Sequence, residues 1–282
     1  GDWFLAQTAI QEGRKPGYYD FLGVKDQVGF EKLVRFDAKL AARLEQRRVV
    51  VFSAITIQPR RIERVPTING GLWRTFDSAE ATDKHNPLRI LDDGDFQFDA
   101  TEQFAPLPNG LPAFYLGDSK GKRQDKAPDN IVGGDRLGGG NDTRLHNSIS
   151  CFRCHLAAAK HESFIKDIDF AKIGKLSSVD YKKFVELRRQ YLRDLQPDMD
   201  HDRVRYAAAI KLATDLSPQT YGQLYQKVFS DYEDARIDAE RAARELGVTK
   251  ATLIKALSGY DAATNSLDPV LSLLLGDGII PQ

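Results

Sequence analysis

The chain contains two cysteines, Cys151 and Cys154, and His155 follows the second one directly. The spacing Cys-x-x-Cys-His is the attachment signature of c-type haem. Two thiols at this spacing on a helical turn reach the two vinyl groups along one edge of a porphyrin, and the adjacent imidazole binds the iron. We therefore predict one covalently bound haem c, with thioether bonds to Cys151 and Cys154 and with His155 as the proximal iron ligand.

Three other uses of the two cysteines agree less well with the sequence. A redox-active dithiol typically follows a strand of a βαβ unit, whereas glycines at positions 138–140 precede this pair. A zinc site needs about four ligands, and the sequence has no second pair of cysteines. A structural disulfide between the two residues would close a very short loop and add little stability.

The sequence leaves the sixth ligand of the iron open. Met199 is the only methionine, and we expect it in an acidic loop, either as an iron ligand or as a side chain that closes a corner between helices. His85 lies in an irregular segment with the reach to bind iron, and its ordinary alternative is a surface position. His146, His161 and His201 are weaker candidates. An empty sixth position, or a residue of another type, is the other alternative.

One acidic segment resembles the start of a calcium-binding EF-hand loop. Asp198, Asp200 and Asp202 alternate as such a loop requires, but Arg203 occupies the glycine position and Ala209 the position of the closing glutamate. We therefore interpret the three acidic residues as the N-terminal cap of a helix.

The bulk composition excludes several classes of protein. Of 282 residues, 41% are hydrophobic and 28% charged, which excludes wholesale disorder. The 40 Lys and Arg residues balance 40 Asp and Glu residues, so the chain lacks the basic excess of a nucleic-acid-binding protein. No apolar run reaches the roughly 18 residues of a membrane span. Because haem c is attached outside the cytoplasmic membrane, we expect a periplasmic or otherwise exported protein, whose start at Gly1 fits removal of a signal peptide.

The first half predicts a mixture of helix, strand and irregular chain. Apolar residues at helical spacing predict a helix over residues 30–46. The β-branched residues after it predict a strand over residues 49–57, ended by Pro59. Residues 59–140 are dense in Gly, Pro, Asn and Asp and predict irregular chain, apart from a hairpin over residues 113–123.

The second half predicts helices only, over residues 181–195, 204–213, 218–228, 239–246, from 249 onward and 268–275. Ser217 and Thr249 are predicted N-caps, and Gly247 is a predicted helix end. We therefore expect a mixed α+β, helix-rich fold. Its irregular α/β N-terminal region, residues 1–140, has a strand and a hairpin, and its all-helical C-terminal region, residues 141–282, carries the haem near the join. The two regions form either two domains or one continuous domain.

Several segments together resemble a family of secreted cytochromes of planctomycete type with a single Cys-x-x-Cys-His motif. The resemblance covers roughly residues 48–260 and is carried by residues 57–64 (IQPRRIER), 71–77 (GLWRTFD), 107–111 (LPNGL), 114–116, 120–123 (KGKR), 127–128, 131–132, 150–155 (SCFRCH) and 202–206 (DRVRY). It implies a haem c protein outside the cytoplasm, with haem attachment at Cys151 and Cys154 and ligation by His155. The chain departs from the family at Leu111-Pro112-Ala113, where Leu-Gln-Gly is usual, and Met199 is not at a position typical of the family.

We therefore expect an exported monohaem c-type cytochrome that passes single electrons between redox partners. Region 1–140 is larger than a minimal cytochrome needs, which indicates a partner-binding surface or a subunit of a larger complex. With a net charge of zero, docking would depend on local patches. The alternative is a haem enzyme with an open or displaceable distal site that acts on peroxide or another small substrate, with Tyr115, Arg123 or His85 lining that site. A third hypothesis is a structural or binding module whose core the haem completes.

Overall fold

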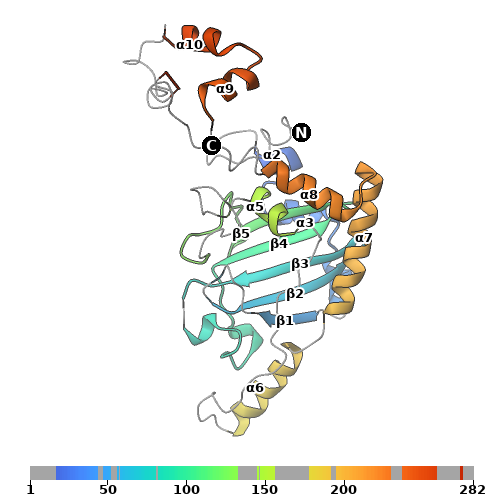
Figure 1. The fold of residues 1–282 in the computed structure, drawn as a ribbon. Helices are drawn as coiled ribbons and strands as arrows, with labels where there is room; N and C mark the ends of the chain where they lie inside the picture. The colour runs from blue at the N-terminus through green and yellow to red at the C-terminus, as the bar shows by residue number, and fades with distance from the viewer. Residues whose placement is uncertain are drawn as a thin grey trace. The chain divides into compact units, whose positions relative to one another are not determined.

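The structure of the chain is a computed structural model (Figure 1). It describes residues 17–43, 47–51, 56, 58–80, 82–132, 145, 147–155, 178–191, 195–229, 237–258 and 274–275. The chain consists of two compact units. Residues 1–136 and 144–222 form the first unit, and residues 137–143 and 223–282 form the second. These units cut across the expected regions 1–140 and 141–282, because helices of the second region pack against the sheet of the first.

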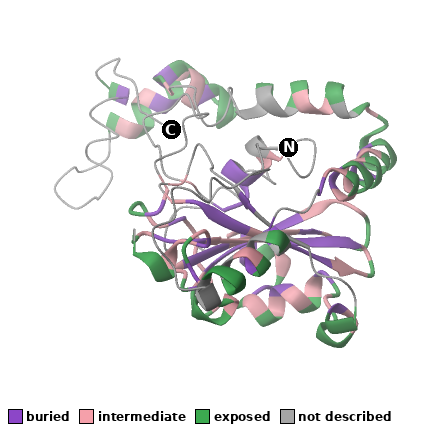
Figure 2. Ribbon diagram, turned by 90° about the horizontal axis from the view of Figure 1, so that it is seen from below, coloured by how far each residue is buried: buried purple, intermediate pink, exposed green. Residues whose placement is uncertain are grey.

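The first unit is built on a five-stranded antiparallel sheet in the order β1-β2-β3-β4-β5 (Figure 1). The strands are β1 (Arg47–Val51), β2 (Arg60–Thr67), β3 (Gly70–Asp77), β4 (Ala100–Pro106) and β5 (Pro112–Asp118). Each strand pairs with the next one along the chain, so the sheet is a meander. Buried residues are concentrated along these strands (Figure 2).

The prediction of irregular chain over residues 59–140 is wrong, because four of the five strands lie there. In β2, Arg60, Arg61, Glu63 and Arg64 interrupt the alternation of apolar and polar residues that indicates a strand. All four are nevertheless buried, at 6–9% exposure. The strand predicted over residues 49–57 is present as β1, which begins two residues earlier, at Arg47, whereas residues 52–55 and 57 lie outside the described residues.

The two faces of the sheet differ in what covers them. The strand register places Trp73 opposite Phe104 and Phe104 opposite Phe114. These three side chains therefore form a row, the aromatic row, on one face of the sheet. We call this face the site face. The alternate residues of the same strands, including Tyr115, point to the opposite face. There the ring of Tyr115 stacks on Phe30 with centroids 5.3 Å apart.

Three short helices precede the sheet: α2 (Tyr18–Leu22), α3 (Gln27–Leu33) and α4 (Ala38–Arg43). The single helix predicted over residues 30–46 is therefore wrong. Arg35 ends the first segment in a left-handed conformation with φ of 58°. The carboxylate of Asp37 then accepts hydrogen bonds from the backbone N–H groups of Lys39 and Leu40 and starts α4.

Two 3-10 turns, η1 (Asp83–His85) and η2 (Asp93–Asp95), lie in the connection between β3 and β4. Helix α6 (Ser178–Tyr191) joins this connection to the sheet. Its Tyr191 donates a hydrogen bond to Asp93 at 2.8 Å, and Arg61 of β2 donates to the same carboxylate at 3.1 Å.

The described elements after residue 141 are helices, as predicted: α5 (Ile149–Cys154), α6, α7 (Gln196–Thr214), α8 (Pro218–Phe229), α9 (Ala239–Glu245) and α10 (Lys250–Ser258). Ser217 and Thr249 accept hydrogen bonds from Thr220 N–H and Thr252 N–H, both at 3.1 Å, which confirms the predicted caps. Gly247 has φ of 70° at the predicted helix end. The helix predicted over residues 268–275 lies largely outside the described residues.

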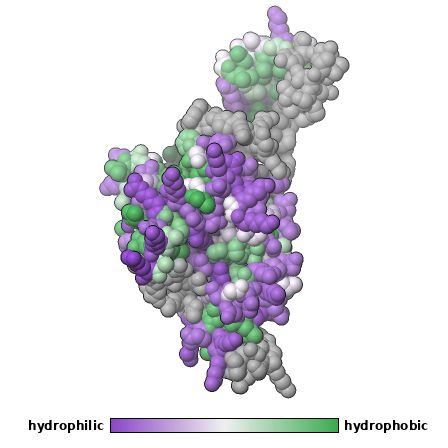
Figure 3. All heavy atoms as spheres, turned by 180° about the vertical axis from the view of Figure 1, so that it is seen from behind, coloured by the Kyte–Doolittle hydropathy of each residue, from purple (hydrophilic) through white to green (hydrophobic). Residues whose placement is uncertain are grey.

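Within the described part of the chain, none of the helices has the length and apolar character to cross a membrane. The face of the molecule seen in Figure 3 is mostly hydrophilic, and its hydrophobic residues occur in small separate groups. The described residues visible on that face therefore form no extended apolar patch.

Candidate functional site

Helix α5 carries the Cys-x-x-Cys-His motif. The helix follows Ser148, whose φ is 69°, and ends at Cys154; the backbone N–H of the next residue, His155, donates to the carbonyl of Cys151 at 2.8 Å. Cys151 and Cys154 are three residues apart in this helix and therefore lie on the same side of one turn. The helical turn that haem attachment requires is thus present. The side chain of Cys154 lies outside the described part of the structure.

Two side chains of α5 attach the helix to the site face. Cys151 is 6% exposed and belongs to a hydrophobic cluster that includes Tyr18 and Phe114. Its Sγ lies 3.6 Å from Oδ1 of Asn147. The ring of Phe152 packs edge-on against Phe114 with centroids 4.8 Å apart.

The imidazole of His155 lies on the aromatic row of the site face. Its centroid is 4.8 Å from that of Phe104 and 5.9 Å from that of Phe114. Nε2 lies 3.9 Å from Oε1 of Glu102, and both side chains are about one-fifth exposed (20% and 19%). The ring is thus held by apolar contacts on one side and faces a carboxylate with its Nε2 edge.

Glu102 belongs to a buried charged network on the same face. Arg60 donates to Glu102 at 2.8 Å, to Asp77 at 2.6 and 2.9 Å and to Thr75 at 2.8 Å. Burial disfavours ionisation of Glu102, but the positive charges of Arg60 and His155 outweigh it and lower the pKa of this carboxyl group. Glu102 therefore bridges the Arg60 guanidinium and the imidazole as a carboxylate.

Met199 is not in a loop, because α7 begins at Gln196 and includes it. Pro197 occupies the first turn of α7, where its missing N–H costs nothing. The Met199 side chain is 1% exposed and packs in a cluster with Trp73 and Leu195, against which Phe104 also packs. The structure thus brings Met199 to the site face, near the aromatic row that holds His155.

The other histidines that the structure describes are placed elsewhere. Nδ1 of His85 lies 2.7 Å from Oγ1 of Thr82 and 3.6 Å from Glu80, in the connection between β3 and β4. His201 is exposed and its Nδ1 lies 3.6 Å from Asp202. His146 and His161 lie outside the described residues.

Tyr115 and Arg123, predicted to line a distal site in the enzyme hypothesis, do not lie beside His155. Tyr115 is on the opposite face of the sheet and donates to the carbonyl of Gly121 at 2.7 Å. Arg123 donates to the carbonyl of Val24 at 3.1 Å and lies over the ring of Tyr19. Both side chains connect β5 and the turn after it to the first helices.

Asp202 is a site-face residue whose role the sequence did not show. Its carboxylate accepts two hydrogen bonds from Arg64, at 2.9 and 3.0 Å, and one from the indole of Trp73 at 2.8 Å. Asp198 lies 3.3 Å from the same guanidinium. The cap interpretation of this acidic segment is therefore wrong for Asp202, which lies in the second turn of α7 and joins the helix to β2 and β3.

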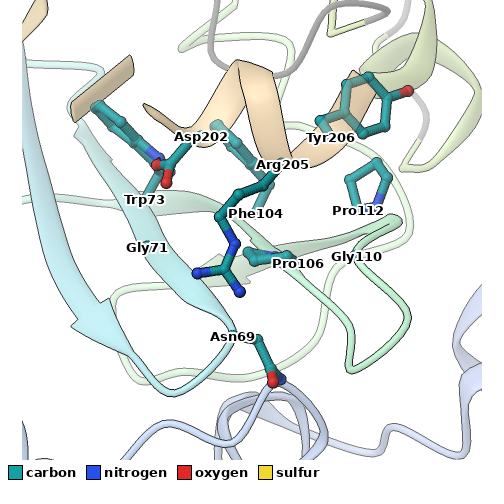
Figure 4. Close-up of a pocket in the computed structure, with 10 residues that line it drawn as sticks. All are labelled: Asn69, Gly71, Trp73, Phe104, Pro106, Gly110, Pro112, Asp202, Arg205 and Tyr206. Atoms are coloured by element: carbon teal, nitrogen blue, oxygen red, sulfur yellow. The ribbon is translucent and has the colours of Figure 1, made fainter. Parts of the chain in front are cut away.

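A small, shallow depression, partly open to solvent, lies where α7 meets the site face (Figure 4). It is lined by Asn69, Gly71, Trp73, Phe104, Pro106, Gly110, Pro112, Asp202, Arg205 and Tyr206. Phe104 belongs both to this lining and to the support of His155. We call this depression the α7 pocket.

Comparison of the chain with models of known protein families, with curated proteins and with solved structures finds no match. The described residues contain no group of three or more His, Cys, Asp and Glu side chains able to hold a metal ion. Cys151 and Cys154 lie in one turn of α5 and His155 follows at its C-terminal end, which is the order of residues that covalent attachment of a porphyrin uses.

Proposed function

We propose that the chain is an exported monohaem c-type cytochrome that transfers single electrons between redox partners. The observation that carries this proposal is the placement of Cys151, Cys154 and His155 on one turn of α5 and at its end, against the site face. A haem bound there would supply an iron centre that accepts and releases one electron.

The surrounding residues would orient and tune that centre. Phe104 and Phe114 limit rotation of the His155 ring and keep water from one side of it. The carboxylate of Glu102 places negative charge beside the imidazole, and neighbouring charge and hydrogen bonding are the means by which a protein sets the potential of such a ligand.

Export and partner binding belong to the same proposal. Covalent attachment of haem c takes place outside the cytoplasmic membrane, so the working protein would be periplasmic or otherwise exported. With 40 basic and 40 acidic residues, the chain offers no net field to steer a partner, and docking would depend on local surface. The partner would be a redox protein or a larger electron-transfer complex.

Mass analysis of the denatured protein, made in a host that matures c-type cytochromes, tests haem attachment. We expect the wild-type chain to be heavier by one haem. The double variant C151S/C154S should have the mass of the polypeptide alone. An unmodified wild-type mass would refute the proposal.

Replacement of His155 by alanine tests the proximal ligand. H155A should keep the attached haem but lose the low-spin absorption spectrum, whereas H201A, which removes an exposed histidine, should leave the spectrum unchanged. An unchanged spectrum in H155A would show that another residue ligates the iron. Carbon monoxide added to the reduced wild type separates the two functional classes, because rapid binding indicates an open distal site and hence the enzyme hypothesis.

A further inference from the structure

Helix α5 is held on the site face by the packing of a few side chains. Cys151 belongs to the hydrophobic cluster that contains Phe114, and the ring of Phe152 packs edge-on against Phe114. The imidazole of His155, which follows the helix, lies on Phe104. A helix of six residues has little stability of its own, so packing against the sheet decides whether α5 stays in place.

Two features just before α5 oppose this packing. Ser148 has φ of 69° and ψ of −66°, a combination that is rare and strained for a residue with a side chain. Asn147 is 0% exposed, and its Nδ2 has no hydrogen-bond partner among the described residues. A buried donor without a partner destabilises the folded state. Both penalties disappear when the segment leaves the sheet, because the backbone can then relax and water can accept from the amide.

The sheet itself is held together by contacts that do not involve α5. Each strand pairs with the next one along the chain. At the outer edge of β5, the backbone N–H of Phe114 donates to the hydroxyl of Tyr18 at 2.9 Å. The backbone N–H of Leu116 donates to the hydroxyl of Tyr19 at 2.7 Å. Departure of α5 would therefore uncover the ring of Phe114 but leave the strand pairing and these edge contacts in place.

The thiol of Cys151 is closed to large reagents while α5 lies on the sheet. The residue is 6% exposed, and its cluster includes the rings of Tyr18 from α2 and Phe114 from β5. Attachment of haem adds the S–H bond of a thiol across a vinyl double bond, so the sulfur has to reach the edge of a large flat ring. A ring of that size does not fit against a sulfur packed among the side chains of a core.

We propose that α5 detaches from the site face as a unit while the sheet stays folded, and that this local opening exposes Cys151 for reaction. The segment that moves is residues 147–155. Local opening of a short segment needs less free energy than unfolding of the whole protein. As a step of haem attachment the opening rests on the proposed function, whereas the motion itself is measured without haem.

Alkylation of Cys151 by iodoacetamide, followed by mass analysis of peptides, tests the proposal. The full-length chain carries C154S, so that Cys151 is the only native thiol, and a host without cytochrome maturation keeps that thiol unmodified. A208C adds a reference thiol at an exposed position of α7. Without urea, Cys151 should react about a hundredfold more slowly than the reference thiol. Its rate should change little at urea concentrations well below the unfolding transition, because local opening exposes little surface.

Two variants distinguish opening of α5 from unfolding of the whole unit. F152A removes the ring that packs on Phe114 and should speed alkylation of Cys151 at least about tenfold. D202A weakens the attachment of α7 to the sheet and does not change α5, so it should alter the rate less than about twofold. Circular dichroism of each variant would verify that the fold is retained.

Two results would overturn the proposal. One is a rate for Cys151 close to that of the reference thiol, which would show that α5 does not cover the sulfur. The other is a rate that becomes measurable only near the unfolding transition, or that rises as much in D202A as in F152A, because the thiol would then be exposed only by unfolding of the whole unit. Absence of haem from the wild-type chain would refute the proposed function but leave these rates unaffected, so the two failures are distinguishable.

Discussion

At the scale of single residues, Glu102 connects the candidate haem ligand to the interior of the protein. One carboxylate oxygen lies 2.8 Å from Arg60, and the other lies 3.9 Å from Nε2 of His155. A buried guanidinium with too few hydrogen-bond partners destabilises the folded state. Removal of the Glu102 charge should therefore lower the free energy of unfolding, and it also removes the negative charge beside His155.

We expect E102Q to lower the free energy of unfolding by about 1–3 kcal/mol at pH 7. The pKa of folded Glu102 lies below its ordinary value of 4.5, so the ionised carboxylate stabilises the fold above that pH, and its contribution disappears as the pH falls through the lower, folded pKa. Urea unfolding of the wild type and of E102Q at several pH values measures the difference between their free energies of unfolding. This difference should have its full size at pH 7 and become smaller below pH 4.5. E186Q, at an exposed position of α6, should show no such deficit.

At the scale of secondary-structure elements, Asp202 joins α7 to two strands of the sheet. Asp202 accepts from two residues of different strands, Arg64 of β2 and Trp73 of β3. The same contact positions the buried indole of Trp73, which is among the residues that line the α7 pocket. Asp202 therefore acts together with Asp198, which contacts the same guanidinium, and with the buried Met199 in attaching the helix to the sheet.

D202A should destabilise the protein by about 3 kcal/mol, because it leaves the buried guanidinium of Arg64 with Asp198 alone. D200A removes a carboxylate from an exposed position of the same helix and should change stability by less than about 0.5 kcal/mol. Urea unfolding measures both variants. Similar losses in the two would mean that the contact of Asp202 with Arg64 adds nothing specific.

The elements also show which parts of the fold the sequence could predict. The starts and ends of helices at Ser217, Gly247 and Thr249 were predictable, because their signals act over three or four residues. Strand β2 was missed because the charges of Arg60 and Arg64 indicate an exposed segment, whereas partners far along the chain, such as Asp77 and Asp202, make their burial possible.

The candidate site likewise has residues that could be predicted from the sequence and residues that could not. The two cysteines and His155 were predictable, since their spacing is local. The support of His155 was not, because Phe104, Phe114 and Glu102 lie about 40–50 residues earlier in the sequence and meet the imidazole only through strand register.

At the scale of the whole molecule, the candidate functions belong to one of the two compact units. The motif, the aromatic row and the α7 pocket all come from residues 69–206, which are part of the first unit apart from residues 137–143. Helices α9 and α10 belong to the second unit and contact each other. The first unit should therefore keep its structure, and the haem proposed for it, without these two helices.

A chain that ends at residue 229, after α8, tests this division. We expect it to carry one haem by mass and to have the absorption spectrum of the full chain, because every described residue of the candidate site remains. A chain that ends at residue 195 is the matched control: it lacks α7, and so loses both Met199 from the apolar cluster and Asp202 from Arg64, and it should unfold at a clearly lower urea concentration. If the chain that ends at residue 229 carried no haem or had a different spectrum, the second unit would contribute to the site, and the assignment of the candidate site to the first unit would be wrong.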